Sequence, residues 1–259
     1  MNQDIKQCWA SFPMEQHFAE GLREKWNLEK YHDPYSPTVM FGWYDDKDIE
    51  FIKNHKSSIV VLWGGADMSS FRIDYIKNRK DTYQIGYGWQ KILFERCNAP
   101  YKDLNVPYKS YDRFKPTILG ENIYVYRGWK VPRNDYFKWD NFTNPLFDVF
   151  GEDRFTFGMG HDIDYVHKNF YENCFVYLKP NERGGSTSMY ELAHMGRKTI
   201  AQNQGGLPNV LEYRDIHHVI ELIQQEAEKI GTIQEQISLD IKNHMNNDYR
   251  WLNLNFLKK

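Results

Sequence analysis

Glycines and hydroxyl side chains gather in one polar stretch of the chain, and their spacing fits the binding of a phosphate. An apolar run, Cys174 to Leu178, precedes this stretch, and a helical pattern, Met189 to Met195, follows it. Backbone N–H groups at the start of a helix attract phosphate through their free hydrogens and the helix dipole. Glycine lets the backbone approach a ligand closely, and hydroxyls add donors. The expected ligand is a nucleotide or another phosphorylated small molecule, and the candidate residues are Gly184, Gly185, Ser186, Thr187 and Ser188.

The phosphate-binding candidates lie inside a predicted βαβ unit. The apolar run before them indicates a buried strand, Gly196 closes the helix, and Lys198 to Ala201 indicates a second strand. An ordinary loop with a helix N-cap is the alternative interpretation of the same residues. The pattern G-x-x-x-x-G-K-[ST] does not occur in the sequence, which excludes a Walker loop.

Two further polar residues follow predicted strands and are candidates for catalysis. The continuous apolar run from Ser58 to Trp63 indicates a strand covered on both faces, and it ends at Gly64, Gly65 and Asp67. Asp67 could act as a base on an acceptor hydroxyl, with Gly64 and Gly65 beside that acceptor. A helix cap or Asx-turn is the alternative for Asp67. His161 follows a later strand and is a second catalytic candidate, although a lone histidine is usually structural.

Strands alternate with helices in both halves of the chain, which predicts parallel sheets with helices on both faces. A turn-rich stretch from Tyr101 to Pro116 separates the halves. The predicted fold class is therefore α/β, with two Rossmann-like domains, residues 1–116 and 117–259, facing a cleft. The last helix is expected to be able to pack back on the first domain. Ligands in open α/β sheets bind beyond the carboxyl ends of the strands, where both Gly-Gly loops fall.

The composition of the chain argues against several classes of function. The chain has 259 residues and a formal net charge of -2, so no global basic field would hold a polyanion. Its 3 cysteines are far apart and lack zinc-ligand spacing, which fits a reducing cytosol. We expect a soluble cytoplasmic protein, because no signal peptide or transmembrane run occurs in the sequence. The carboxylates of Asp45, Asp46 and Asp48 open a predicted helix, and we expect them to stabilise its dipole rather than bind metal.

The run from Glu182 to Pro208 resembles the donor-binding half of GT-B glycosyltransferases, particularly their retaining members. In that superfamily a Gly-containing loop leads into a helix with the pattern E-A-x-A-x-G, then a strand of the type P-V-I-A, then G-G-x-P-E. The corresponding residues here are Glu191-Leu-Ala193-His-Met-Gly196, Lys198-Thr-Ile-Ala201 and Gly205-Gly-Leu-Pro208-Asn209. The resemblance is specific in this stretch and looser over the rest of the C-terminal half.

The resemblance implies roles for several residues. Glu191 would accept hydrogen bonds from the ribose hydroxyls of a nucleotide, whereas the spacing Ser188-x-x-Glu191 also fits a capping box. A leaving diphosphate gains negative charge, and arginine can bind phosphate through two N–H groups. Basic residues that would bind the donor diphosphate are Arg127, Lys130, Arg133 and Arg183, and a solvated basic loop is the alternative for the first three.

The expected activity is transfer of a sugar from a UDP- or GDP-type nucleotide sugar to an acceptor hydroxyl. The resemblance favours retention over inversion and implies no cofactor and no essential metal. A glycan, a protein or a modified nucleic-acid base could be the acceptor. The alternative is a module of the same fold that binds a nucleotide sugar or a glycan without turnover. A dehydrogenase or epimerase is disfavoured, because no G-x-G-x-x-G fingerprint follows an early strand.

Overall fold

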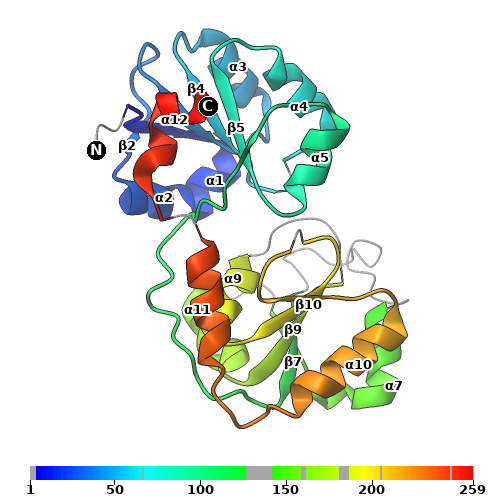
Figure 1. Ribbon diagram of the computed structural model, residues 1–259. Helices are drawn as coiled ribbons and strands as arrows, with labels where there is room; N and C mark the ends of the chain where they lie inside the picture. Colours follow the sequence, from blue (N-terminus) through cyan, green and yellow to red (C-terminus); the bar gives the residue numbers. More distant parts are fainter. Residues whose placement is uncertain are drawn as a thin grey trace. The chain divides into compact units, whose positions relative to one another are not determined.

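The computed structural model describes residues 4–65, 67–126, 142–158, 162–180, 187–204, 206–245 and 247–258. The chain divides into two compact units (Figure 1). The first unit comprises Met1–Ser110 together with Met245–Lys259, and the second comprises Tyr111–His244. Each unit contains one open, parallel β-sheet with helices, so the predicted α/β class with two Rossmann-like sheets is confirmed.

The sheet of the first unit has the order β2-β1-β3-β4-β5-β6, and every pair in it is parallel. Its strands are β1 (Gln7–Ala10), β2 (Glu29–Lys30), β3 (Thr38–Phe41), β4 (Ile59–Leu62), β5 (Thr82–Gly86) and β6 (Lys102–Asp103). The helices between them are α1 (Phe12–His17), α2 (Ala19–Trp26), α3 (Asp46–Asn54), α4 (Ser70–Lys77) and α5 (Gln90–Arg96).

Side chains that alternate along these strands form two cores, one on each face of the sheet. Val39 and Phe41 belong to the core that α1 and α2 cover, whereas Met40 belongs to the core that α3, α4 and α5 cover. This alternation explains why β3 and β4 are apolar at every position.

The end of the chain completes the core of the first unit. A 3-10 turn, η4 (Tyr249–Leu252), and helix α12 (Leu254–Lys258) join the core on the α1 and α2 face (Figure 1). Trp251 is fully buried there, and the backbone N–H of Ile5 donates to the carbonyl of Leu252 at 3.1 Å.

The sheet of the second unit has the order β11-β10-β9-β7-β8 and is also parallel throughout. Its strands are β7 (Asn122–Tyr126), β8 (Phe155–Gly158), β9 (Cys174–Leu178), β10 (Lys198–Ala201) and β11 (Val210–Glu212). Its helices are α7 (Asn144–Phe150), α8 (Ile163–Val166), α9 (Thr187–His194), α10 (Ile216–Ala227) and α11 (Glu235–His244), with a 3-10 turn η2 (Glu152–Arg154) and a π-helical turn η3 (His167–Tyr171).

The sequence did not indicate four of the strands, among them the two-residue β2. Strand β1 lies inside the sheet although residues 1–37 show no strand pattern, and the short edge strands β6 and β11 were also not expected. Among the described residues, no helix is long and apolar enough to cross a membrane.

Candidate functional site

The βαβ unit expected around the Gly-rich stretch is confirmed. Strands β9 and β10 pair in parallel, with Tyr177 opposite Thr199, and α9 connects them. From Ser188 onward every residue of α9 is buried. Thr187 and Ser188 form the start of this helix, so two of the five phosphate-binding candidates are placed at a helix N-terminus. The other candidates in this stretch, Arg183, Gly184, Gly185 and Ser186, lie outside the described residues.

Glu191 belongs to a buried polar cluster rather than to the surface of α9. The Tyr171 hydroxyl donates to Glu191 Oε2 at 2.7 Å and lies 2.8 Å from Ser188 Oγ. Glu191 is only 2% exposed. Because α9 begins at Thr187, Ser188 lies within the helix and not at its N-cap, so the capping box that the spacing also allowed does not form around Ser188.

Tyrosines from neighbouring elements surround this cluster. The ring of Tyr171 meets that of Tyr124 edge-on with centroids 5.2 Å apart, and Tyr124 lies 5.3 Å from Tyr177. Burial and then the Glu191 charge raise the pKa of Tyr171 well above its usual value, and burial does the same for the pKa of Tyr124. Both phenols therefore keep their protons at neutral pH and can donate hydrogen bonds.

Glycine is required opposite Tyr124. A Cβ added to Gly158, the last residue of β8, would lie 2.1 Å from the Tyr124 hydroxyl. This close approach holds the phenol at the carboxyl end of the sheet. No sequence motif marked Tyr171, Tyr124 or Gly158 as site residues, since their relation to Glu191 arises only from the parallel order of β8, β7 and β9.

Arg197 fixes the other end of α9. Its guanidinium is fully buried and donates to the carbonyls of Cys174 at 3.2 Å, Ile118 at 2.8 Å and Met195. It also donates to the hydroxyl of Thr117 at 2.6 Å. Cationic donors are favourable at a helix C-terminus, where carbonyls lack partners. Arg197 thus connects the end of α9 to the start of β9 and to the segment that precedes β7.

Asp67 is placed at the carboxyl ends of two strands of the first unit, and it is fully buried. Its Oδ2 accepts from the backbone N–H of Trp43 at 2.9 Å and of Gly64 at 3.1 Å. Burial raises the pKa of Asp67 to about 6, and these amides oppose the shift. The two amides that donate to Oδ2 come from the turns after β3 and β4, so the carboxylate holds these turns together. The geometry therefore agrees with the turn-stabilising alternative that the sequence left open for Asp67.

The glycines beside Asp67 are constrained by packing. A Cβ on Gly64 would lie 2.8 Å from Met14 Sδ and 2.9 Å from the Tyr44 hydroxyl. Gly65 has φ +118°, a backbone conformation that favours glycine. Their part in acceptor binding stays a prediction. The donor candidates Arg127, Lys130 and Arg133 and the catalytic candidate His161 all lie outside the described residues.

The acidic residues that open α3 act as a cap. Asp45 Oδ1 accepts from the backbone N–H of Lys47 at 2.9 Å, and Asp48 Oδ2 accepts from the backbone N–H of Asp45 at 3.1 Å. This reciprocal arrangement is a capping box, which stabilises a helix N-terminus. The carboxylates of Asp45 and Asp48 thus have the helix-stabilising role expected from the sequence.

No family model matches the sequence, and no curated protein is significantly similar to it. Solved structures do match over most of the chain. Sucrose-phosphate synthase from Thermosynechococcus elongatus has a TM-score of 0.56 and 13% identity, over 85% of this chain and 71% of that chain. HepE from Anabaena, in complex with UDP-glucose, has a TM-score of 0.56 and 10% identity, over 86% of this chain and 77% of that one. TarM has a TM-score of 0.55 and 14% identity, over 86% of this chain and 55% of that one.

These similarities define the fold. The chain has the architecture of the GT-B glycosyltransferases, as the residues from Glu182 to Pro208 indicated. At such low sequence identity, these matches show a common fold and say nothing about the substrates of this chain.

Proposed function

We propose that the chain is a glycosyltransferase that moves a sugar from a UDP- or GDP-type nucleotide sugar to an acceptor hydroxyl, with retention of configuration. One observation carries the proposal: the Glu191 carboxylate is buried, and it lies about one turn after the start of α9, which follows the Gly-rich stretch directly. A carboxylate kept from bulk water makes stronger hydrogen bonds to hydroxyls. The match to HepE, which was crystallised with UDP-glucose, supports a nucleotide sugar as the donor.

The proposed chemistry needs neither a metal nor a cofactor. The bond from the anomeric carbon to the diphosphate oxygen breaks, and the departing diphosphate keeps the electron pair. The acceptor oxygen forms the new bond to the anomeric carbon on the same face, and its proton passes to the departing diphosphate. Backbone amides at the start of α9 and the basic side chains expected from the sequence would stabilise that charge. Arg127, Lys130, Arg133 and Arg183 are the candidates for this role.

Thermal unfolding in the presence of UDP, GDP, UDP-glucose and GDP-mannose tests donor binding. A ligand at one hundred times its Kd adds about 2.7 kcal/mol of stability, which is readily measured. Glu191→Gln should reduce the shift, because an amide is a weaker acceptor for ribose hydroxyls than a carboxylate. The matched control is Glu221→Gln, which changes an exposed glutamate on α10.

Release of the nucleoside diphosphate from the donor then tests catalysis. We expect turnover that is unchanged by EDTA, since the proposal includes no metal. Binding without any turnover would instead support the alternative, a non-catalytic nucleotide-sugar or glycan binding module. A chain that binds none of the four ligands refutes the transferase and the nucleotide-sugar module, and leaves only a module that binds glycans.

A further inference from the structure

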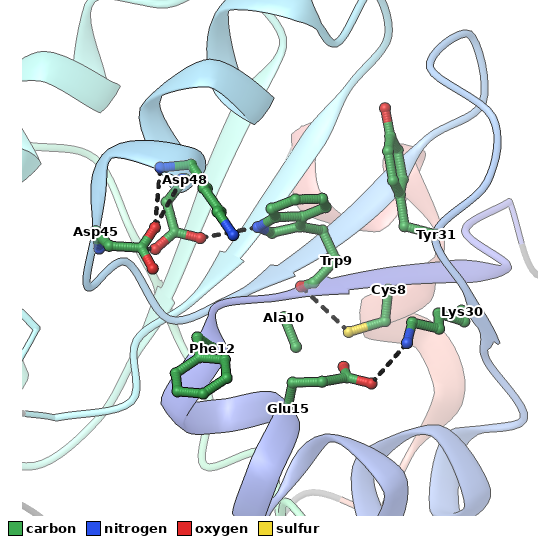
Figure 2. A pocket seen from close by; sticks show the side chains of 10 residues that line it. Cys8, Trp9, Ala10, Phe12, Glu15, Lys30, Tyr31, Asp45 and Asp48 are labelled. Atoms are coloured by element: carbon green, nitrogen blue, oxygen red, sulfur yellow. Dashed lines mark hydrogen bonds and ion pairs between the residues drawn. The ribbon is translucent and has the colours of Figure 1, made fainter.

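The first unit contains a pocket of about 240 Å³ that no sequence motif indicated (Figure 2). Its walls come from four places in the unit: the end of β1, the first turns of α1, the end of β2 and the capped start of α3. Trp9, Phe12, Tyr31 and Asp45 are among its lining residues. A pocket of this volume is smaller than the roughly 300–1,000 Å³ of drug-sized ligand sites, so it suits a single ring.

The pocket lies where the topology of a parallel sheet favours ligand binding. Strand β1 lies between β2 and β3 in the sheet. The chain therefore forms β2 on one side of β1 and then crosses to form β3 on its other side. Such a point of reversal leaves a crevice at the carboxyl ends of the two central strands, and ligands bind there in open α/β sheets. Ala10 and Phe12 line the pocket at the end of β1, and Asp45 lines it shortly after the end of β3.

Strand β2 is too short to cover this side of β1. The backbone N–H of Tyr31 donates to the carbonyl of Cys8 at 3.0 Å, and that of Ser11 donates to Phe41 on β3 at 3.1 Å. Peptide groups of a strand alternate between its two neighbours, so those of Ala10 face the β2 side. Because β2 ends at Lys30, the pocket opens beside Ala10.

The aromatic wall of the pocket is rigid. Trp9 stacks on Phe51 with ring centroids 4.8 Å apart and planes 9° apart, and Tyr31 meets it edge-on at 5.6 Å. The indole N–H of Trp9 donates to Asp48 Oδ1 at 2.9 Å. A ring held by three neighbours loses little conformational entropy when a ligand contacts it. At the pocket mouth, Phe12 adds a second aromatic surface that is 64% exposed (Figure 2).

Two carboxylates of the pocket, Glu15 and Asp48, already have partners, and Lys47 and Asp45 add one charge of each sign, so the lining favours a ligand without net charge. Glu15 binds Arg23 at 2.8 Å and Lys30 at 3.1 Å. Asp48 accepts from Trp9 through one oxygen and from backbone amides through the other. Asp45 caps α3 through Oδ1, and the hydrogen bonds among the described residues do not use its Oδ2. A ligand hydroxyl can donate to that oxygen, since a carboxylate accepts several hydrogen bonds.

We propose that this pocket binds a sugar ring of a glycan acceptor. The assignment of the ring to an acceptor rests on the proposed glycosyltransferase function. A sugar ring presents apolar C–H groups to an aromatic surface such as Phe12 and places hydroxyls at its edge, within reach of Asp45. A nucleic-acid acceptor fits less well, because the lining carries the three carboxylates Glu15, Asp45 and Asp48 against the two lysines Lys30 and Lys47, which leaves a net negative charge.

Ligand-observed NMR on the full chain tests the proposal with methyl glycosides of glucose, galactose and mannose, and with thymidine and cytidine. At least one glycoside should bind. Phe12→Ala should weaken its affinity roughly three- to tenfold, the effect of losing one aromatic contact. The matched control is Phe71→Ala on α4, because Phe71 is 72% exposed in the same unit and does not line the pocket. Asp45→Asn should also weaken binding, and it keeps the helix cap because asparagine caps as well as aspartate.

Three results would overturn the proposal: no glycoside binds, a glycoside binds Phe12→Ala as tightly as the wild type, or only the nucleosides bind. A parallel titration with UDP separates this proposal from the proposed function. A chain that binds UDP but no glycoside refutes the pocket assignment and leaves the transferase function standing. A chain that binds a glycoside in a Phe12-dependent way but no nucleotide supports a sugar pocket and refutes the transferase function.

Discussion

Replacing Tyr171 by phenylalanine removes one hydroxyl from the interior of the second unit and leaves its ring in place. The ring keeps its edge-on contact with Tyr124, whose centroid is 5.2 Å away. The loss is the hydrogen bond to Glu191 at 2.7 Å and the contact with Ser188 at 2.8 Å. Tyr171→Phe therefore tests whether the hydroxyl positions the Glu191 carboxylate for the donor.

The magnitude follows from the burial and charge of the acceptor. A hydrogen bond to a charged group contributes about 1.5–3 kcal/mol of net stability. In a protein of this size, each kcal/mol of lost stability lowers Tm by about 2–4 °C, so Tm should fall by roughly 3–12 °C. If the freed carboxylate also turns away from the ribose, the loss of about 1.4 kcal/mol raises the Kd for UDP roughly tenfold.

Calorimetric titration with UDP, together with thermal unfolding, measures both effects. The control is Tyr249→Phe, which removes a neutral hydrogen bond from the Tyr249 hydroxyl to the carbonyl of Lys25 at 2.9 Å in the first unit. It should lower stability by about 1 kcal/mol and leave UDP affinity unchanged. A Tyr171→Phe variant that is destabilised but binds UDP as the wild type does would show that Tyr171 supports the fold and not the donor site. Unchanged stability would refute the hydrogen-bond argument itself.

Two further predictions concern buried charges. Arg197→Met should lower the free energy of unfolding by about 3–5 kcal/mol in urea denaturation, because several buried carbonyls lose their donor; a loss below 1 kcal/mol would contradict this account. Asp67 has a folded-state pKa of about 6 against an ordinary value of 3.8, so between these values the folded state binds more protons than the unfolded state. Stability should therefore fall as pH rises from about 4 to 6, and Asp67→Asn should flatten this part of the urea-unfolding profile; an unchanged slope would exclude Asp67 as its source.

The strands that the sequence predicted well are those with strong local signals. Cys174 to Leu178 forms β9 with the expected bounds, and the run from Ser58 to Trp63 contains β4. Both are buried on two faces, so their continuous apolar pattern was sufficient. Strand β1 gave no such signal, because its first residue is the polar Gln7. That side chain is buried by hydrogen bonds to Thr38 Oγ1 at 2.7 Å and to the carbonyl of Asp33 at 2.6 Å, which come from distant parts of the chain.

The candidate site was predictable only where a motif runs along the chain. The spacing of Glu191 and Gly196 indicated the helix and its end, and Gly196 has the φ of +87° that a helix-closing glycine adopts. Tyr171 reaches Glu191 from a π-helical turn, and Arg197 donates to Cys174 and Ile118, which come much earlier in the sequence. Such contacts depend on sheet order and cannot be inferred from local patterns. Asp67 had two open interpretations, and the amides that donate to it from Trp43 and Gly64 support the turn-stabilising one, which no local pattern could show.

The return of the last residues to the first unit has a consequence for synthesis. Trp251, Leu252 and Leu257 fill a core whose other buried members precede Ser110, so the earlier-made part of this unit lacks part of its interior until these residues have been synthesised. Until then, nascent chains of this protein should expose apolar surface to chaperones. A product that ends at His244 should be degraded even though its βαβ unit is intact, which couples survival in the cell to the synthesis of residues 245–259.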